Sequence, residues 1–332
     1  MVTTDSYSTT TLAASEIFTP VQESLNAVET CLRMVAPKQH EELTAATEHL
    51  LNSGGKRMRP AISLLSSELA AADFDQAVSL AAAVEMLHTA TLVHDDLIDG
   101  ALLRRGIPTL NANWSPDATI LTGDYLFARA ASLASETSNV RVMDLFAKTL
   151  MTIVNGEITQ KFSNDGPTSR EMYFDRIYAK TASMFRLATE AAAIIGDVGE
   201  AAERALGEFG RQIGMAFQIV DDVLDFVSTS ERIGKPVGGD LYQGLVTLPA
   251  LCYFEENPDD PDVKAFKNGH MRDREVVARV VSAVRDTGAA KEALREAREY
   301  AQRAQSALSF FPDSSYTRAL IASSDYIVSR EI

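Results

Sequence analysis

The chain has 332 residues and a formal net charge of -15, which argues against nucleic acid as a partner. Its two cysteines, Cys31 and Cys252, form neither a disulfide framework nor a thiolate metal site, so we expect a cytoplasmic protein. No apolar run reaches the roughly 18 residues that a membrane span needs, so no transmembrane segment is predicted. Residues 1–17 are rich in Ser and Thr and lack the basic and apolar regions of a signal peptide. They are predicted to be a flexible tail.

From residue 18 onward, apolar residues recur at spacings of three and four, which predicts helices over nearly the whole chain. The expected helices cover residues 18–35, 39–53, 61–72, 75–99, 117–135, 140–163, 169–195, 198–228 and 245–256, followed by three more amphipathic segments. Breaks are expected at Asn52–Gly55, in a loop over residues 102–108 and in the glycine-rich stretch 234–240. No βαβ rhythm or internal repeat is present. Residues 18–332 are therefore predicted to form one all-α domain.

Two of the long predicted helices end in clusters of three aspartates. These are Asp95, Asp96 and Asp99 in the first helix and Asp221, Asp222 and Asp225 in the second. A helix turns about 100° per residue, so the first and third aspartate of each cluster share a face. Carboxylates this close repel one another, and all-oxygen clusters suit Mg²⁺ or Mn²⁺. A solvated acidic helix end explains one such cluster as well, but the second copy favours a metal site.

Polar residues lead into both clusters. His88 and Thr91 lie in line with Asp95, and Gln218 lies in line with Asp221, on helices that are otherwise apolar. Taken alone, His88 is better explained as a core histidine with its hydrogen bonds satisfied. Together, the two polar stripes predict two walls of one polar cavity.

Basic residues gather at a few points in this acidic chain. They are Lys56, Arg57 and Arg59, then Arg104 and Arg105, and further on Lys180 and Lys235. Metal ions held by carboxylates usually bridge to a substrate phosphate, and Lys and Arg bind further phosphate oxygens directly. There is no GxxxxGK[ST] motif and no GxGxxG after a strand, which disfavours a nucleotide. The pattern predicts a substrate with a diphosphate-like charge and an apolar body.

Several stretches, in order, resemble the trans-polyprenyl diphosphate synthases of the long-chain type. They are GGKRMRP, LHTATLVHDDLIDGALLRRGIPT, GDYLFARAA, KTA, FQIVDDVLDF and GKPVGGDLYQGLVTLP. The resemblance runs from about residue 20 to the C-terminus. It implies a single bundle of mostly antiparallel helices around a deep central cavity, and a homodimer. It also implies a prenyltransferase that condenses isopentenyl diphosphate head to tail with an allylic diphosphate.

The resemblance implies a role for each site residue. The six aspartates, Asp95, Asp96, Asp99, Asp221, Asp222 and Asp225, would bind Mg²⁺, with three ions per active site when substrate is bound and Mn²⁺ as an alternative. Arg104, Lys180 and Lys235 would contact the allylic diphosphate, and Lys56, Arg57, His88 and Arg105 would hold isopentenyl diphosphate. Thr181 and Gln218 would line the place where the allylic cation develops. The expected catalytic residues are Asp95, Asp96, Asp221, Lys180, Thr181 and Gln218.

One position departs from the family pattern. The usual G-K-x-T of the last motif is here Gly244-Leu245-Val246-Thr247, so the allylic diphosphate lacks one expected lysine. We expect this to weaken the binding of small allylic starters, whose affinity depends mostly on the diphosphate. A longer starter could offset the loss through its buried tail, at about 0.8 kcal/mol per buried CH₂.

The residues before Asp95 bear on product length. Leu87, Ala90 and Thr91 belong to the part of the first aspartate helix along which a growing chain would run, and Ala90 stands about 7.5 Å below Asp95 along the axis. In the family an aromatic residue at this place closes the cavity and gives a short product. Ala90 and Thr91 therefore predict a long chain, roughly C30 to C50, of the kind used for quinone side chains. An ordinary helix-packing role for Ala90 is the alternative.

Other functions remain to be weighed. A geranylgeranyl or farnesyl diphosphate synthase would share every motif. A terpene cyclase usually pairs its DDxxD with an Asn/Ser/Glu motif, which this chain replaces with a second DDxxD. A metal phosphohydrolase built on His94-Asp95 needs more histidine ligands, and this chain has only five histidines, with none beside the second cluster. A non-catalytic regulatory subunit is supported by Leu245 alone, because both aspartate triads are complete. The residues leave open whether a transient membrane contact releases the product.

Overall fold

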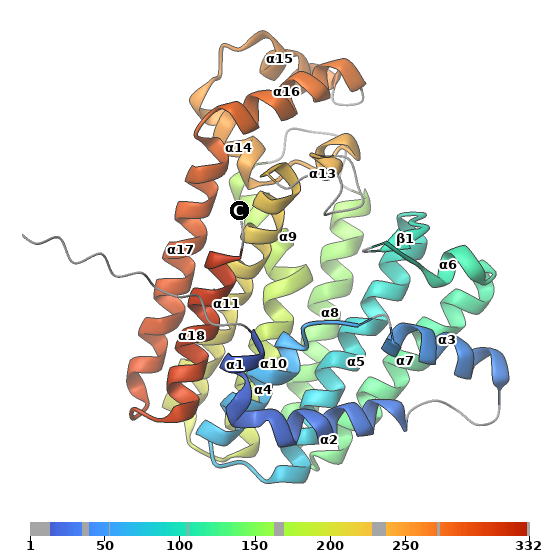
Figure 1. The fold of residues 1–332 in the computed structure, drawn as a ribbon, viewed down its shortest axis with the longest axis vertical. Coiled ribbons are helices and arrows are strands. Elements are labelled where there is room, and N and C mark those ends of the chain that lie inside the picture. The colour runs from blue at the N-terminus through green and yellow to red at the C-terminus, as the bar shows by residue number, and fades with distance from the viewer. Residues whose placement is uncertain are drawn as a thin grey trace, which may run out of the picture.

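The computed structural model describes residues 14–34, 40–52, 54–104, 106–162, 169–227, 237–270 and 273–330. Within these ranges nearly all of the ordered chain is helical, and the long helices run roughly antiparallel to one another (Figure 1). The expected all-α fold is confirmed.

Helix α5 (Phe74–Ile98) is the central element and carries the first aspartate cluster at its C-terminal end. The side chain of Asp73 caps its N-terminus by accepting hydrogen bonds from the backbone N–H groups of Asp75 and Gln76. Its many alanines allow close packing against α2 (Gln22–Arg33), α4 (Met58–Leu69), α7 (Pro116–Glu136) and α10 (Ser183–Ile195).

Helix α5 is the one helix in the described ranges that is long and apolar enough to cross a membrane, by length and composition alone. However, 61% of its apolar 18-residue window is buried inside the protein. The structure therefore uses α5 as the core helix of a bundle.

Helix α11 (Glu200–Val227) carries the second cluster and packs against α10, α17 (Ala289–Ala307) and the π-helix η2 (Tyr178–Ala182). Glycine on α11 permits this contact. A Cβ added at Gly214 would lie 2.5 Å from the Cα of Ala182 in η2. The absence of a side chain at Gly214 thus brings the second aspartate helix against the segment that contains Lys180 and Thr181.

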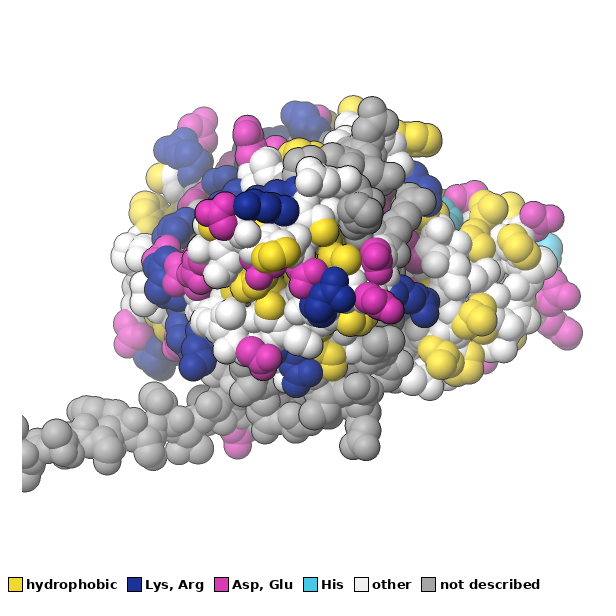
Figure 2. Space-filling model, turned by 90° about the horizontal axis from the view of Figure 1, so that it is seen from above, with side chains coloured by type: hydrophobic (Ala, Val, Ile, Leu, Met, Phe, Trp, Pro, Cys, Tyr) yellow, Lys and Arg dark blue, Asp and Glu magenta, His cyan; other side chains and the backbone are white. Residues whose placement is uncertain are grey.

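The remaining elements surround these helices (Figure 1). They are α1 (Ala14–Ile17), η1 (Thr19–Val21), α3 (Glu41–Asn52), β1 (Leu103–Arg104), β2 (Ile107–Pro108), α6 (Leu110–Asn113), α8 (Val140–Phe162), α9 (Arg170–Ile177), α13 (Gly239–Tyr242), α14 (Leu248–Glu256), α15 (Pro261–Ala265), η3 (Phe266–His270), α16 (Arg274–Asp286), η4 (Leu308–Phe310) and α18 (Ser315–Ser329). Figure 2 looks onto the end that carries α15 and α16, where acidic and basic side chains lie side by side. There Arg279 of α16 pairs with Asp262 of α15 at 2.7 Å.

The buried apolar side chains form two clusters that meet along α11. The first surrounds α5 and includes Leu87, Phe185 and Ile213. The second lies between α11, α14, α16 and α17 and includes Val220 and Leu248. Helix α11 therefore belongs to both halves of the core, which sets its position relative to α5.

Three local expectations differ from the structure. The helix expected over residues 169–195 widens into the π-helix η2 in its middle, and the loop expected over 102–108 contains the two-stranded hairpin β1–β2. Of the expected tail, residues 1–13 lie outside the described ranges, whereas Ala14–Ile17 form a helical turn with Ile17 buried. The other predicted helices end within a few residues of the observed bounds.

The close approach at Gly214 predicts a local sensitivity. Gly214→Ala should lower the free energy of unfolding by about 1–3 kcal/mol, because the added methyl group meets backbone that cannot move aside easily. Gly288→Ala is the control, since a Cβ at Gly288 meets no atom within 4 Å. Urea denaturation of both variants measures the difference, and equal stabilities would contradict the packing described here.

Candidate functional site

Two consecutive residues of η2 connect the two aspartate clusters. Lys180 contacts Asp95 of the first cluster, whereas Thr181 donates a hydrogen bond to Gln218, which in turn donates to Asp222 of the second. In an α-helix successive side chains diverge by about 100°, and a π-helical turn is frequent at functional sites. The clusters are 126 residues apart in the sequence (Asp95 to Asp221), and η2 brings them to one site.

The first cluster is held by a cation between two carboxylates. Lys180 Nζ lies 3.0 Å from Asp95 Oδ2 and 2.9 Å from Glu157 Oε1 of α8. Burial raises the pKa of Asp95, and the nearby charges of Glu157 and Asp99 add to this against the opposing effect of Lys180. Burial alone would lower the pKa of Lys180, but Asp95 and Glu157 outweigh it and raise that pKa. Lys180 therefore stays protonated, and its charge only partly offsets the effect of burial on the pKa of Asp95.

The neighbouring aspartate is paired with a residue from the hairpin. Arg104 of β1 donates to both carboxylate oxygens of Asp96 at 2.8–3.1 Å, a bidentate pair. Asp96 is buried, whereas Asp99, the residue that follows α5, is exposed. Asp96, an expected metal ligand, and Arg104, an expected diphosphate ligand, thus bind each other here. Each would have to release the other before it could bind metal or diphosphate.

A buried chain of hydrogen bonds orients the middle aspartate of the second cluster. Tyr173 of α9 donates its hydroxyl to Asp222 Oδ2 at 2.7 Å, and Gln218 donates to Asp222 Oδ1 at 2.9 Å. Thr181 donates to the Gln218 carbonyl at 2.6 Å. Burial raises the pKa of Asp222 to about 7, with the nearby charge of Asp240 adding to the effect.

The other two aspartates of this cluster have partners from distant parts of the chain. Arg330, just after α18, pairs with Asp221 at 2.9 Å and lies over the ring of Phe217, 4.3 Å from its centroid. The backbone N–H of Asp240 donates to Asp225 at 3.3 Å. The C-terminal helix and α13 therefore both close on the end of α11.

Lys56 and Arg57, which are expected to bind isopentenyl diphosphate, both contact side chains from other parts of the chain. Arg57 adopts a left-handed backbone (φ 47°) and its guanidinium pairs with Glu29 and with Glu85, the latter at 2.8 Å. Lys56 donates to the hydroxyl of Tyr326 at 3.0 Å. A strained backbone that is held by two carboxylates is typical of a residue that is positioned for function.

Arg59 packs differently from its two neighbours. Its guanidinium lies over the rings of Phe185 and Phe217, 4.8 and 5.5 Å from their centroids. Arg59 thereby connects α4 with α10 and α11.

The residues that bear on product length lie on the buried side of α5. Leu87 and Ala90 are fully buried within the first core cluster, and Thr91 is buried with its hydroxyl donating to the carbonyl of His88. His88 itself is half-buried one turn from Thr91. The hydroxyl of Thr91 is thus used by its own helix, which leaves its methyl group as the part available for apolar contact.

Two predicted ligands, Arg105 and Lys235, lie outside the described residues. Four further residues contact the site or its segments and were not predicted from the sequence: Glu157, Tyr173, Arg176 and Arg330. A signal existed only for Glu157, which follows Gly156 on α8. A Cβ at Gly156 would lie 2.6 Å from the Cβ of Ala179, so this glycine marks where α8 meets η2.

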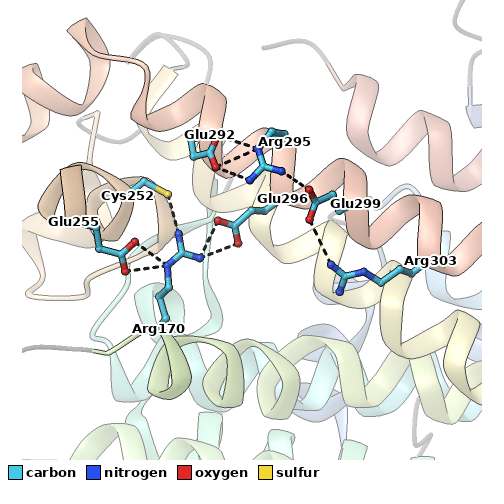
Figure 3. A network of polar contacts seen from close by, with 8 residues as sticks. All are labelled: Arg170, Cys252, Glu255, Glu292, Arg295, Glu296, Glu299 and Arg303. Carbon is cyan, nitrogen blue, oxygen red and sulfur yellow. Dashed lines mark hydrogen bonds and ion pairs between the residues drawn. The ribbon is translucent and has the colours of Figure 1, made fainter.

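Helix α9, which carries Tyr173, is anchored at its N-terminal end. Arg170 donates to Glu255 of α14 at 2.9 Å, pairs with Glu296 of α17 at 2.8 Å and contacts Cys252 Sγ (Figure 3). Glu292, Arg295, Glu299 and Arg303 extend the row of charges along α17. Because Arg170 ties α9 to two helices, the hydroxyl of Tyr173 is held in a defined place.

The donor set at the two clusters suits a hard divalent cation. Within the described ranges no three Asp, Glu, His or Cys side chains converge closely enough to hold an ion, because the aspartates contact Lys180, Arg104 and Arg330 instead. All the donors are carboxylate oxygens, which Mg²⁺ prefers. Burial raises the pKa of both Asp95 and Asp222, and a divalent cation at these carboxylates would favour their charged form, so the residues fit such an ion.

Known proteins resemble this chain over most of its length. The polyprenyl synthetase family model matches residues 40–285. Heptaprenyl diphosphate synthase component 2 of Geobacillus stearothermophilus is 38% identical over 88% of this chain and 91% of its own length. All-trans-nonaprenyl-diphosphate synthase (geranyl-diphosphate specific) of Rhodobacter capsulatus is 34% identical over 92% of this chain and 94% of its own.

A solved structure extends the likeness to the whole fold. The polyprenyl synthase from Caulobacter crescentus, complexed with calcium and isoprenyl diphosphate, superposes with a TM-score of 0.90 at 33% identity. The match covers 97% of this chain and 99% of that one.

The environment of Asp222 predicts a pH-dependent effect on stability. Because its folded pKa of about 7 lies above the ordinary aspartate value of 3.8, the native state binds more protons between these pH values and loses stability as the pH rises through them. Asp222→Asn should therefore raise the Tm of the metal-free protein at pH 8 by several degrees, with little gain near pH 4. Thermal melts in chelator test this. Asp313→Asn, at an exposed carboxylate paired with Arg318, is the control, and a lower Tm for Asp222→Asn at pH 8 would be a contrary result.

Proposed function

Because this chain belongs to the polyprenyl synthetase family, we propose that it condenses isopentenyl diphosphate head to tail with an allylic diphosphate to give a long all-trans polyprenyl diphosphate. The expected product is roughly C30 to C50 in length, a range that includes the heptaprenyl and nonaprenyl products named for two relatives. Such a product would serve as a quinone side-chain precursor.

The observation that carries this proposal is the position of η2. Its adjacent residues Lys180 and Thr181 reach the first and the second aspartate cluster, respectively. A diphosphate held between the clusters would meet carboxylates from both sides through metal ions and a lysine directly. That arrangement suits a leaving group with a high negative charge.

The six aspartates Asp95, Asp96, Asp99, Asp221, Asp222 and Asp225 are proposed to hold Mg²⁺, with three ions when substrate is bound and Mn²⁺ as an alternative. When bound, the metal supplies Lewis-acid stabilisation of the departing diphosphate. Arg104, Lys180 and Lys235 would contact the diphosphate oxygens. For this, Lys180 exchanges Asp95 for phosphate and Arg104 exchanges Asp96, which leaves both carboxylates available to the metal.

The reaction proceeds by heterolysis of the allylic C–O bond. Both bonding electrons leave with the diphosphate, and the cation that remains faces the oxygens of Thr181 and Gln218. The double bond of isopentenyl diphosphate attacks this cation, and loss of one proton from the adduct restores a double bond. The released diphosphate accepts the proton. The apolar surroundings on α5 and α10 exclude water that would quench the cation.

Isopentenyl diphosphate is proposed to bind Lys56, Arg57, His88 and Arg105. Glu29 and Glu85 hold the Arg57 guanidinium in one orientation, so little side-chain entropy is lost when it binds a phosphate. Lys56 and Arg57 directly precede α4, and His88 lies on α5. Because α4 and α5 pack directly against each other, these residues could bind the same isopentenyl diphosphate from two helices.

Several broader features form part of the proposal. Residues 18–332 are proposed to act as one domain in the cytoplasm, where free Cys31 and Cys252 stay reduced. Exposed apolar side chains on α7 and α8, among them Leu121, Met151 and Ile158, support a homodimer through this face. A transient membrane contact would accept the apolar product.

The first test is product analysis. Purified protein with Mg²⁺, radiolabelled isopentenyl diphosphate and allylic starters of different lengths should form a polyprenyl diphosphate longer than C25. A geranylgeranyl or farnesyl product would contradict the long-chain assignment. Release of phosphate or a hydrocarbon without elongation, or no reaction at all, would contradict the synthase itself.

Product length should respond to Ala90. Ala90→Phe should shorten the main product by several isoprene units, because an aromatic ring would block the path along α5. Ala81→Phe is the matched control, since Ala81 is also fully buried on α5 but stands about 180° around the helix. If both variants or neither changed the chromatographic chain-length profile, Ala90 would not line the path of the product.

A further inference from the structure

Arg176 of α9 is a half-buried cation that no motif predicts. Its Nη2 donates to the backbone carbonyl of Val246 at 2.7 Å, and its guanidinium lies 5.4 Å from the ring centroid of Tyr173. Tyr173 is the residue that donates to Asp222. Arg176 is therefore one side chain away from the second aspartate cluster.

Arg176 contacts the segment that departs from the family pattern. Gly244-Leu245-Val246-Thr247 has leucine where the family has lysine. Leu245 is held beside α13 by its backbone N–H, which donates to the carbonyl of Asp240 at 2.9 Å. The one arginine that binds this segment's backbone in the described structure thus comes from another helix and reaches the residue next to Leu245.

The surroundings of Arg176 are acidic on three sides. Asp222 on α11, Asp240 on α13 and Glu157 on α8 all interact with its charge, and they oppose the burial that lowers its pKa. An arginine remains protonated in proteins even so. Of its five N–H donors, one is used by Val246, so the guanidinium can bind further acceptors.

We propose that Arg176 supplies the positive charge that Leu245 does not, and that its guanidinium binds the allylic diphosphate beside the second aspartate cluster. This assignment rests on the proposed synthase activity and adds a diphosphate ligand to that same site. It also gives the substitution at Leu245 a structural explanation. The cation is kept in the site but originates from α9 in place of the loop before α14.

Arg176 is suited to this position because of how it is held. The contact with the Tyr173 ring and the bond to Val246 orient the guanidinium plane, while the Arg170 network keeps α9 itself in place. A planar guanidinium presents two parallel N–H donors that match two phosphate oxygens, whereas a lysine binds phosphate as a point charge without that fixed geometry.

The test is a steady-state comparison with geranylgeranyl diphosphate as starter. Arg176→Met should raise the KM for the starter about tenfold or more, which is ~1.4 kcal/mol, and leave the KM for isopentenyl diphosphate unchanged. Adding Leu245→Lys to this variant should restore most of the lost affinity. The restored lysine cannot replace the Tyr173 contact, so rescue separates a role of charge from a role in packing.

Two further variants complete the design. Arg176→Gln keeps an N–H donor for Val246 and loses the charge, so it serves if Arg176→Met does not fold. Arg211→Met is the matched control, because Arg211 also lies over a tyrosine, Tyr178, yet pairs with Glu208 and is half-exposed. Its kinetic constants should equal those of the wild type.

The outcomes are distinct. If the wild type elongates its starter but neither Arg176 variant alters the starter KM, or if Leu245→Lys fails to rescue, the role of Arg176 is wrong and the proposed function stands. If the wild type itself makes no longer diphosphate, the proposed function fails first.

Discussion

Repulsion between carboxylates is the constraint on which the rest of this structure depends. Helices α5 and α11 each end in three aspartates, and the fold brings both ends to the short π-helix η2. Each carboxylate that comes close is matched by a donor from elsewhere: Lys180 for Asp95, Arg104 for Asp96, Tyr173 with Gln218 for Asp222, and Arg330 for Asp221. Burial nevertheless keeps the pKa values of Asp95 and Asp222 raised. A divalent ion at these carboxylates would oppose that effect and stabilise their charged form.

Helical periodicity sufficed to predict the all-α fold and most helix bounds, because these depend on local spacing, whereas the metal-binding role of the six aspartates stays a prediction. The π-turn at 178–182 was not predicted, since it arises where Gly156 and Gly214 let two helices approach Ala179 and Ala182. The contacts of Arg176 and Arg330 were not predicted for a similar reason. Their importance comes from tertiary contacts with Val246 and Asp221, which are 70 and 109 positions away in the chain.

The ion pairs also suggest how the site changes state. Lys180 and Arg104 are expected to bind diphosphate, yet here each binds the carboxylate that is expected to bind metal. When a metal diphosphate arrives, each pair can exchange its partner: cation to phosphate and carboxylate to metal. Lys180 and Arg104 would then each have an anionic partner before and after binding, so neither has to become an isolated buried charge.

The most direct measurement is a crystal structure with Mg²⁺ and an unreactive allylic diphosphate analogue. The account predicts that Asp95 and Asp221 coordinate metal, that Lys180 and Arg104 contact the diphosphate, and that the Lys180–Asp95 and Arg104–Asp96 pairs are broken. If the analogue bound elsewhere, or bound with these ion pairs intact and no metal at the aspartates, the two clusters would not be a diphosphate site.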